Sequence, residues 1–119
     1  MSTPRTVTVP TIDHGPLTLD CPDWCTGHDR RPQYRTDVTH YSPEHPLTHD
    51  GQPLLVVVLA QAPFTETGSR EVGAYVEQTG ASGTYSPAGL DALAATLVEH
   101  ARELRSIARR LAVLREVGR

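Results

Sequence analysis

The stretch Cys21-Pro22-Asp23-Trp24-Cys25-Thr26-Gly27-His28 places two thiols and one imidazole within eight residues. Pro22 and Gly27 favour sharp turns of the backbone, which bring these three side chains together. Zinc prefers four tetrahedral ligands drawn from cysteine sulfur and histidine nitrogen, and tight loops provide them at spacings of about two to four residues. Cys21 and Cys25 are separated by three residues, within that range. The stretch therefore predicts a metal-binding loop.

A fourth ligand has to come from outside this loop. We choose His40, which follows His28 by 12 residues on a candidate strand, so that the set reads Cys-x3-Cys-x2-His-x11-His. His45 and His49 are the reserves for this position. A site closed by four protein ligands is structural, whereas three ligands leave a place for water and permit hydrolysis. The sequence predicts structural Zn²⁺ at Cys21, Cys25, His28 and His40.

Other roles for the two cysteines stay open at this stage. A disulfide fits poorly because the N-terminus has no export signal and the chain has no further cysteine. A redox dithiol fits poorly because three intervening residues differ from the thioredoxin-type spacing. The pair could also be two ordinary buried residues. Between the cysteines, Trp24 is expected to fold back as a hydrophobic lid on the site or core.

Composition excludes several classes of protein. The 119-residue chain has 14 acidic residues against 11 basic ones and a net charge of −3. All the basic residues are arginine. This balance argues against a general binder of nucleic acid or anionic membranes. No run approaches the ~18 apolar residues of a membrane span. We expect a cytoplasmic protein.

Residues 1–85 read as a β-rich body. Asp50-Gly51 is a strong hairpin signal, and the continuous apolar run at 54–59 predicts a central strand buried on both faces. A further strand is expected at 5–9, ended by Pro10. Of the other histidines, His14, His45 and His49 are expected to be solvated. The remaining predicted strands are 17–19, 36–41 and a half-exposed one that begins at Val72 and ends at Gly80.

Residues 86–117 predict one long helix. Ser86 can cap it and Pro87 suits its first position. Leucines recur every seven residues from Leu90 with a second apolar series three residues later, in which His100 is expected to be packed near a polar partner. Such a helix would be about 46 Å long, more than strands of roughly 17–20 Å can cover. We therefore expect a homodimer or a protein partner on the helix, through Leu97, Leu104, Ile107, Leu111 and Leu114.

Together these patterns predict an α+β fold: a small antiparallel β-sheet body with a zinc-binding loop, then one long C-terminal α-helix. The chain is expected to be a single domain over 1–119. The favoured function is a zinc-stabilised interaction or regulatory protein with a self-associating helix. One alternative is a small hydrolase with an open Cys2His zinc site and Asp37 or Glu44 as base. Another is weak nucleic-acid binding through Arg102, Arg105 and Arg109, which the net charge disfavours.

Four runs carry a family resemblance: TIDHGP at 11–16, CPDWCTGH at 21–28, DVTH at 37–40 and GLDALA at 89–94. Together they resemble a small actinobacterial domain family of unknown function, frequent in Streptomyces-type genomes, with the motif CPxWCxxxH followed later by a histidine. Cys21, Pro22, Trp24 and Cys25 match the motif, and His28 follows Cys25 by three positions where many relatives have four. The resemblance spans residues 7 to about 114. It implies no activity, and it agrees with a cytoplasmic bacterial setting.

Overall fold

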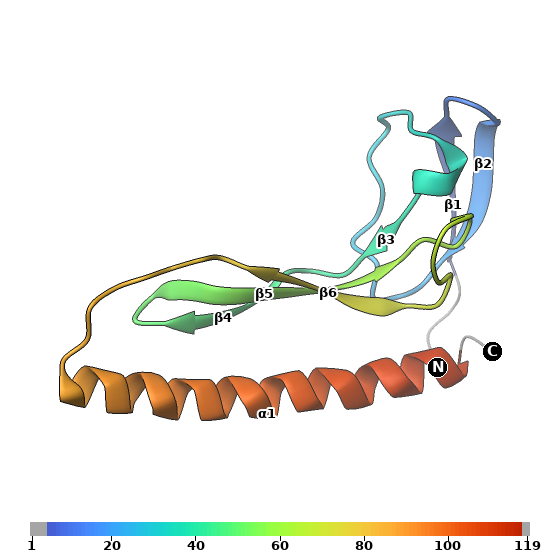
Figure 1. The fold of residues 1–119 in the computed structure, drawn as a ribbon. Coiled ribbons are helices and arrows are strands. Elements are labelled where there is room, and N and C mark those ends of the chain that lie inside the picture. The colour runs from blue at the N-terminus through green and yellow to red at the C-terminus, as the bar shows by residue number, and fades with distance from the viewer. Residues whose placement is uncertain (1–4, 118–119) are drawn as a thin grey trace. The chain divides into compact units, whose positions relative to one another are not determined.

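The computed structural model describes residues 5–117 and has the expected α+β architecture, with antiparallel strands followed by one long C-terminal helix (Figure 1). The single domain predicted over 1–119 includes residues 1–4 and 118–119, which lie outside the described residues. The elements are β1 (Arg5–Thr11), β2 (Gly15–Cys21), the 3₁₀ helix η1 (Arg35–Asp37), β3 (His40–Tyr41), β4 (His45–His49), β5 (Gln52–Gln61), β6 (Gly73–Gln78) and α1 (Pro87–Val117).

The chain forms two compact units that are not successive in sequence. Unit 1 consists of Met1–Pro43 and Val58–Tyr75, and unit 2 of Glu44–Val57 and Val76–Arg119. The strands β5 and β6 both cross the boundary between the units.

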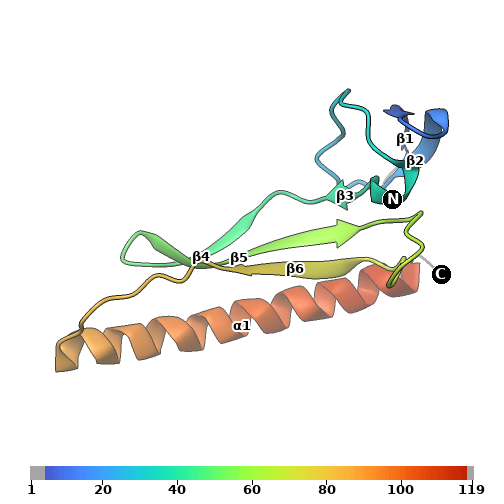
Figure 2. The ribbon, with the colours of Figure 1, turned by 45° about the horizontal axis from the view of Figure 1, so that its top comes forward.

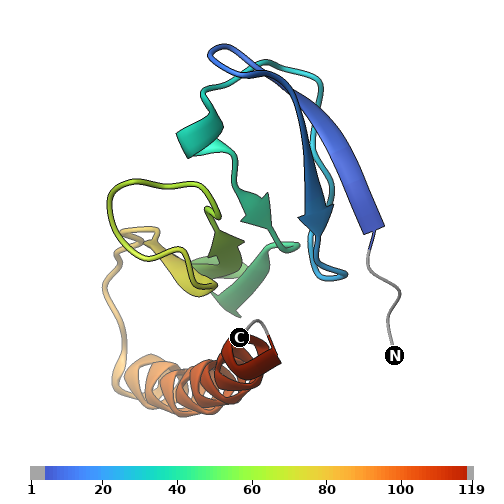
Figure 3. The same ribbon diagram turned by 90° about the vertical axis from the view of Figure 1, so that its right-hand side faces the viewer.

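The antiparallel hairpin of β1 and β2 begins unit 1 and is visible in Figure 3. The prediction that the first strand ends at Pro10 is wrong, because β1 continues to Thr11. Pro10 lies opposite Pro16. Neither proline has an N–H to donate. Both fit at a non-hydrogen-bonded pair of the antiparallel ladder, where facing residues exchange no hydrogen bonds. Inward-facing residues of the hairpin build a small core, which consists of Val9, Leu19 and Val38 with Val7, Leu17 and Phe64 packed against it.

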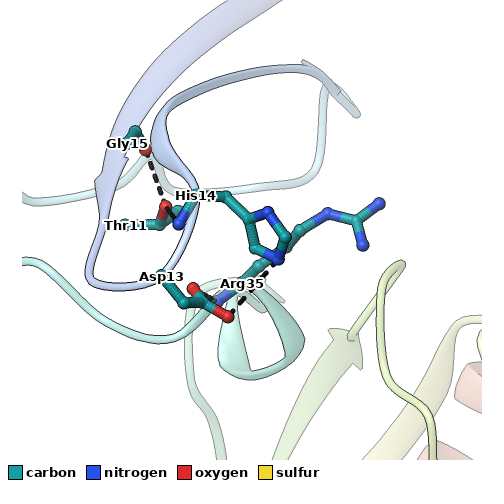
Figure 4. A network of polar contacts seen from close by, with 5 residues as sticks. All are labelled: Thr11, Asp13, His14, Gly15 and Arg35. Carbon is teal, nitrogen blue, oxygen red and sulfur yellow. Dashed lines mark hydrogen bonds and ion pairs between the residues drawn. The ribbon is translucent and has the colours of Figure 1, made fainter.

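Polar contacts hold the tip of this hairpin (Figure 4). The Thr11 hydroxyl donates to the carbonyl oxygen of Gly15 at 2.6 Å and accepts from the backbone N–H of His14 at 2.9 Å. The Asp13 carboxylate accepts from the backbone N–H of Arg35 at 2.9 Å, and it also lies 3.5 Å from the ring of His14. As expected, His14 is exposed. The contact with Arg35 fastens the hairpin tip to η1.

The strand predicted at 36–41 is mostly wrong. The chain forms η1 at Arg35–Asp37, and only His40 and Tyr41 are in a strand, paired with β5. A tight turn replaces the expected extension, since the N–H of Asp37 donates to the carbonyl of Tyr34 at 2.9 Å. Just after the turn, Val38 and His40 are both buried, as two residues on one face of a strand would be.

The hairpin predicted at Asp50-Gly51 is confirmed, and it joins β4 to β5 in unit 2. Both residues have positive φ, 48° for Asp50 and 76° for Gly51, as a two-residue turn of this class requires. The run at 54–59 is central as predicted, because β5 pairs with β3, β4 and β6. Within that run only Val57 and Leu59 are buried, so its expected burial on both faces is incomplete.

The helix α1 starts where the sequence predicts. Ser86 Oγ accepts a hydrogen bond from the N–H of Gly89 at 3.0 Å, and Pro87 is the first helical residue. The helix is 31 residues long and unbroken. No helix among residues 5–117 combines the length and apolar character needed to cross a bilayer.

Histidines connect α1 with β4, which runs beside it in unit 2 (Figures 1 and 2). His100 is buried as expected, and its Nε2 lies 3.0 Å from the carbonyl oxygen of Thr48. The expectation that His49 is solvated is wrong: it is 9% exposed, with Nδ1 2.9 Å from Thr96 Oγ1. The hairpin turns this end of β4 onto the helix, which local sequence could not indicate. His45 is exposed.

Candidate metal centre

Three elements of unit 1 present the Cys and His side chains. Cys21 is the last residue of β2, and His40 is the first residue of β3. Between them the chain turns, with the N–H of Cys25 donating to the carbonyl of Pro22 at 3.0 Å. Gly27, at φ 105°, then redirects the backbone before His28. Strand ends and a tight loop thus bring four donors from 20 residues of chain to one place.

The four donor atoms form a compact cluster, all within 4.8 Å of one another. Cys21 Sγ lies 3.8 Å from His40 Nδ1, and Cys25 Sγ lies 3.6 Å from His28 Nε2. The two histidine nitrogens, His28 Nε2 and His40 Nδ1, are 3.2 Å apart. With Zn–S of about 2.3 Å and Zn–N of about 2.0–2.1 Å, a tetrahedron has S···N edges of about 3.6 Å and N···N edges of about 3.3 Å. The three distances match these edges closely.

The cluster is largely shielded from solvent. Cys21, Cys25 and His40 are 3%, 4% and 2% exposed, and His28 is partly buried. Trp24 is itself buried and meets the ring of His40 edge-on, with centroids 6.3 Å apart. Trp24 is thus folded back against His40, as expected. Both cysteines are free thiols.

Backbone contacts hold the loop around the sulfurs. The N–H of Gly27 lies 3.4 Å from Cys25 Sγ, where it can donate to a thiolate. The N–H of Thr26 donates to the carbonyl of Tyr41 at 2.8 Å, which ties the loop to β3. The Arg5 guanidinium donates to the carbonyl of Cys25. No local sequence pattern points to Arg5, because its place beside the loop follows from the register that sets Arg5 opposite Cys21.

Burial controls the protonation of the cluster without a metal. Burial raises the pKa of the Cys21 thiol, and the neighbouring Cys25 raises it further, while Arg5 opposes the shift. Burial lowers the pKa of His40 to about 4, with further lowering by His28 and Arg5. The pKa of His28 is lowered by burial and then by Arg5. Both imidazoles are thus held neutral, the form that binds metal. A bound cation would counter the cost of two thiolates in this buried place.

The structure brings together the four residues chosen from the sequence and leaves the reserves elsewhere. His45 and His49 belong to β4 in unit 2. Asp37 and Glu44, the bases considered for a hydrolase, are exposed, and the cluster found among residues 5–117 contains no carboxylate. On α1, Leu97 is 50% exposed, whereas the other residues expected at a dimer seam are half-buried: Leu104, Ile107, Leu111 and Leu114.

The fold and this cluster define an α+β domain with a possible Cys/His metal site. The chain belongs to the family described as Domain of unknown function (DUF6907), whose model matches residues 6–113. No curated protein and no solved structure matches the chain.

Proposed function

We propose that this protein is a zinc-stabilised interaction module in which Cys21, Cys25, His28 and His40 hold one structural Zn²⁺. The observation that carries the proposal is the agreement of three of the six donor separations, 3.8, 3.6 and 3.2 Å, with the edges of a zinc tetrahedron. A set of two thiolates and two imidazoles also binds zinc in preference to harder cations such as magnesium or calcium.

A structural role suits the donor count and the small core. Four protein donors fill a tetrahedron, so no position is left for the water that a hydrolase would activate. The buried core of unit 1 centres on Val9, Leu19 and Val38. Zinc binding contributes about 10–16 kcal/mol to the folding of zinc-finger peptides, which is large beside the stability of a small domain. The metal would hold the loop from Cys21 to His28 against β3.

The proposed interaction role is supported by α1. Several of its large apolar side chains remain exposed, among them Leu90, Leu97 and Val98 at 50–58%. Apolar surface that is contiguous along one helix marks a place where another protein binds. We propose self-association through this helix, with a regulatory role for the assembled protein.

The test of the zinc proposal is metal analysis of the purified protein combined with ligand variants. We expect one zinc per chain and two thiols that become reactive only after chelation. His40→Ala should lose the metal and destabilise the fold. His14→Ala is the matched control, because His14 is an exposed histidine of the same unit.

A further variant separates loss of metal from failure to fold. His40→Cys supplies a thiolate in place of the imidazole, and Cys3His sites also bind zinc. We expect His40→Cys to retain about one zinc per chain. Full zinc content in His40→Ala would contradict the closed site, and absence of zinc from the wild-type protein purified without chelator and supplied with zinc would overturn the proposal.

A further inference from the structure

The helix α1 has two apolar stripes, and only one of them is covered by other parts of residues 5–117. At 100° per residue, one stripe consists of half-buried or buried residues: Leu93, Thr96, His100, Leu104, Ile107, Leu111 and Leu114. The second lies about a quarter turn around the helix and is mostly exposed. We call it the free stripe, and it consists of Leu90, Ala94, Leu97, Val98, Ala101, Ala108 and Ala112.

The free stripe differs in size along its length. Its first half carries its large side chains, with Leu90 58%, Leu97 50% and Val98 54% exposed. Its second half has only alanines as apolar members, Ala108 and Ala112, and Arg105 and Arg115 lie in the same angular range of the helix. Two copies in antiparallel orientation, centred near Ala101, would place Leu90 of one against Ala112 of the other. Each end of the seam then pairs a large residue with a small one. In between, Ala94 faces Ala108, the two copies of Ala101 face each other, and Leu97 lies against the stem of Arg105, so the helices can approach closely.

The two halves of α1 also differ in charge. Residues 87–101 carry Asp91 and Glu99 and no arginine, a net charge of −2. Residues 102–117 carry five arginines against two glutamates, a net charge of +3. A parallel pair would set the arginine-rich halves against each other. An antiparallel pair sets each acidic half against a basic half, which lowers the electrostatic energy of association.

One pair of residues fixes this complementarity at the edge of the free stripe. Asp91 and Arg109 are 18 residues apart, which is about five helical turns, so they lie on the same edge of α1. In the antiparallel arrangement Asp91 of each copy lies within about two residues of Arg109 of the other. Both side chains are exposed in the single chain and free to turn toward a partner.

We infer that the free stripe binds a second copy of this chain in antiparallel orientation. This inference deepens the self-association included in the proposed function and rests on it. The inferred seam keeps Leu97 from the seam predicted by the sequence. It replaces the other four predicted residues with Ala94, Ala101 and Ala108, which lie about a quarter turn around the helix: Leu104, Ile107, Leu111 and Leu114.

Sedimentation equilibrium of the full-length protein with its metal bound tests the seam. We expect a dimer at tens of micromolar. Leu97→Glu buries a carboxylate at the seam and should weaken dimerisation at least about tenfold. Val113→Glu is the matched control, because Val113 is 61% exposed on the same helix but outside the free stripe. A monomeric wild-type protein, or equal weakening by the two substitutions, would overturn the inference.

Charge exchange tests the orientation. Arg109→Asp sets two pairs of like charges together in an antiparallel dimer and should weaken it about tenfold. Adding Asp91→Arg restores opposite charges and should return the dissociation constant to within about threefold of wild type. A parallel dimer would show no such rescue. Zinc content is measured on each sample, so a zinc-loaded monomer would reject this inference and leave the metal proposal standing.

Discussion

His40 connects the chemistry of the site with the stability of unit 1. Its imidazole is 2% exposed and the pKa is lowered to about 4, compared with 6.5 for an ordinary histidine. The unfolded chain therefore takes up a proton at this residue at a higher pH than the folded chain does. Stability is retained above pH 6.5 and is lost as the pH falls from 6.5 toward 4.

We predict that metal-free protein loses stability between pH 6.5 and pH 4. His40 contributes a slope of up to about 1.4 kcal/mol per pH unit to the free energy of unfolding. Urea unfolding of chelator-treated protein at a series of pH values measures it. His40→Gln should flatten the profile, whereas His14→Gln, at an exposed site, should leave it unchanged. Identical profiles for wild type and His40→Gln would contradict the prediction.

Gly27 allows the metal loop to turn. Its φ of 105° is unfavourable for any residue with a Cβ, and its N–H faces Cys25 Sγ. We predict that Gly27→Ala weakens zinc binding by about tenfold, since a shift of this backbone displaces the sulfur and His28 together. Competition with a chromophoric chelator measures the affinity. Gly73→Ala is the control, because Gly73 lies in β6 without positive φ and with open space around it, and equal affinities of the two variants would count against the prediction.

Three of the four candidate metal ligands could be predicted because they lie close together in the sequence. His40 lies farther away, so its prediction needed a guess about the strand that carries it. The spacing of Cys21, Cys25 and His28 is local, so a tight loop is enough to bring them together. His40 was chosen because it follows His28 by 12 residues on a predicted strand, and that strand is only two residues long. Arg5 could not be found in this way, because its position depends on pairing across the hairpin.

At the scale of elements, the start of α1 is set by one side chain. Ser86 Oγ accepts from the N–H of Gly89, one of the donors that a helix end leaves without an internal partner. We predict that Ser86→Ala destabilises the protein by about 1 kcal/mol. Thermal or urea unfolding checks this. Ser106→Ala, at an exposed position inside the helix, should be neutral or slightly stabilising, and a loss there equal to that of Ser86→Ala would argue against capping as the cause.

Elements with a local cause were predicted well, and those decided by tertiary contacts were not. Asp50-Gly51 forms the expected turn because its positive φ angles are a property of those residue types. The segment predicted as a strand at 36–41 forms η1 first, where the Asp13 carboxylate at the hairpin tip accepts from the N–H of Arg35. His49 likewise depends on Thr96, 47 residues away.

At the scale of the whole molecule, the metal donors and the helix belong to different compact units. All four donors lie in unit 1, whereas α1 and the β4–β5 hairpin turn lie in unit 2. The helix has its own supports there, with the Ser86 cap and the contacts of His49 and His100 to Thr96 and Thr48. Local openings of a protein follow cooperative units of this kind. A metal bound at these four donors would therefore stabilise unit 1 directly.

We predict that chelation opens unit 1 while α1 keeps its structure. Hydrogen exchange should speed up by at least about tenfold at residues 5–43 on metal removal, because the loop and both its neighbouring strands lose their common ligand. Amides in the middle of α1, around His100, should change by less than about threefold. His40→Cys reloaded with zinc should restore protection in unit 1. Equal loss of protection in both units would show that the protein unfolds as one cooperative body, with the metal site supporting the helix as strongly as the loop.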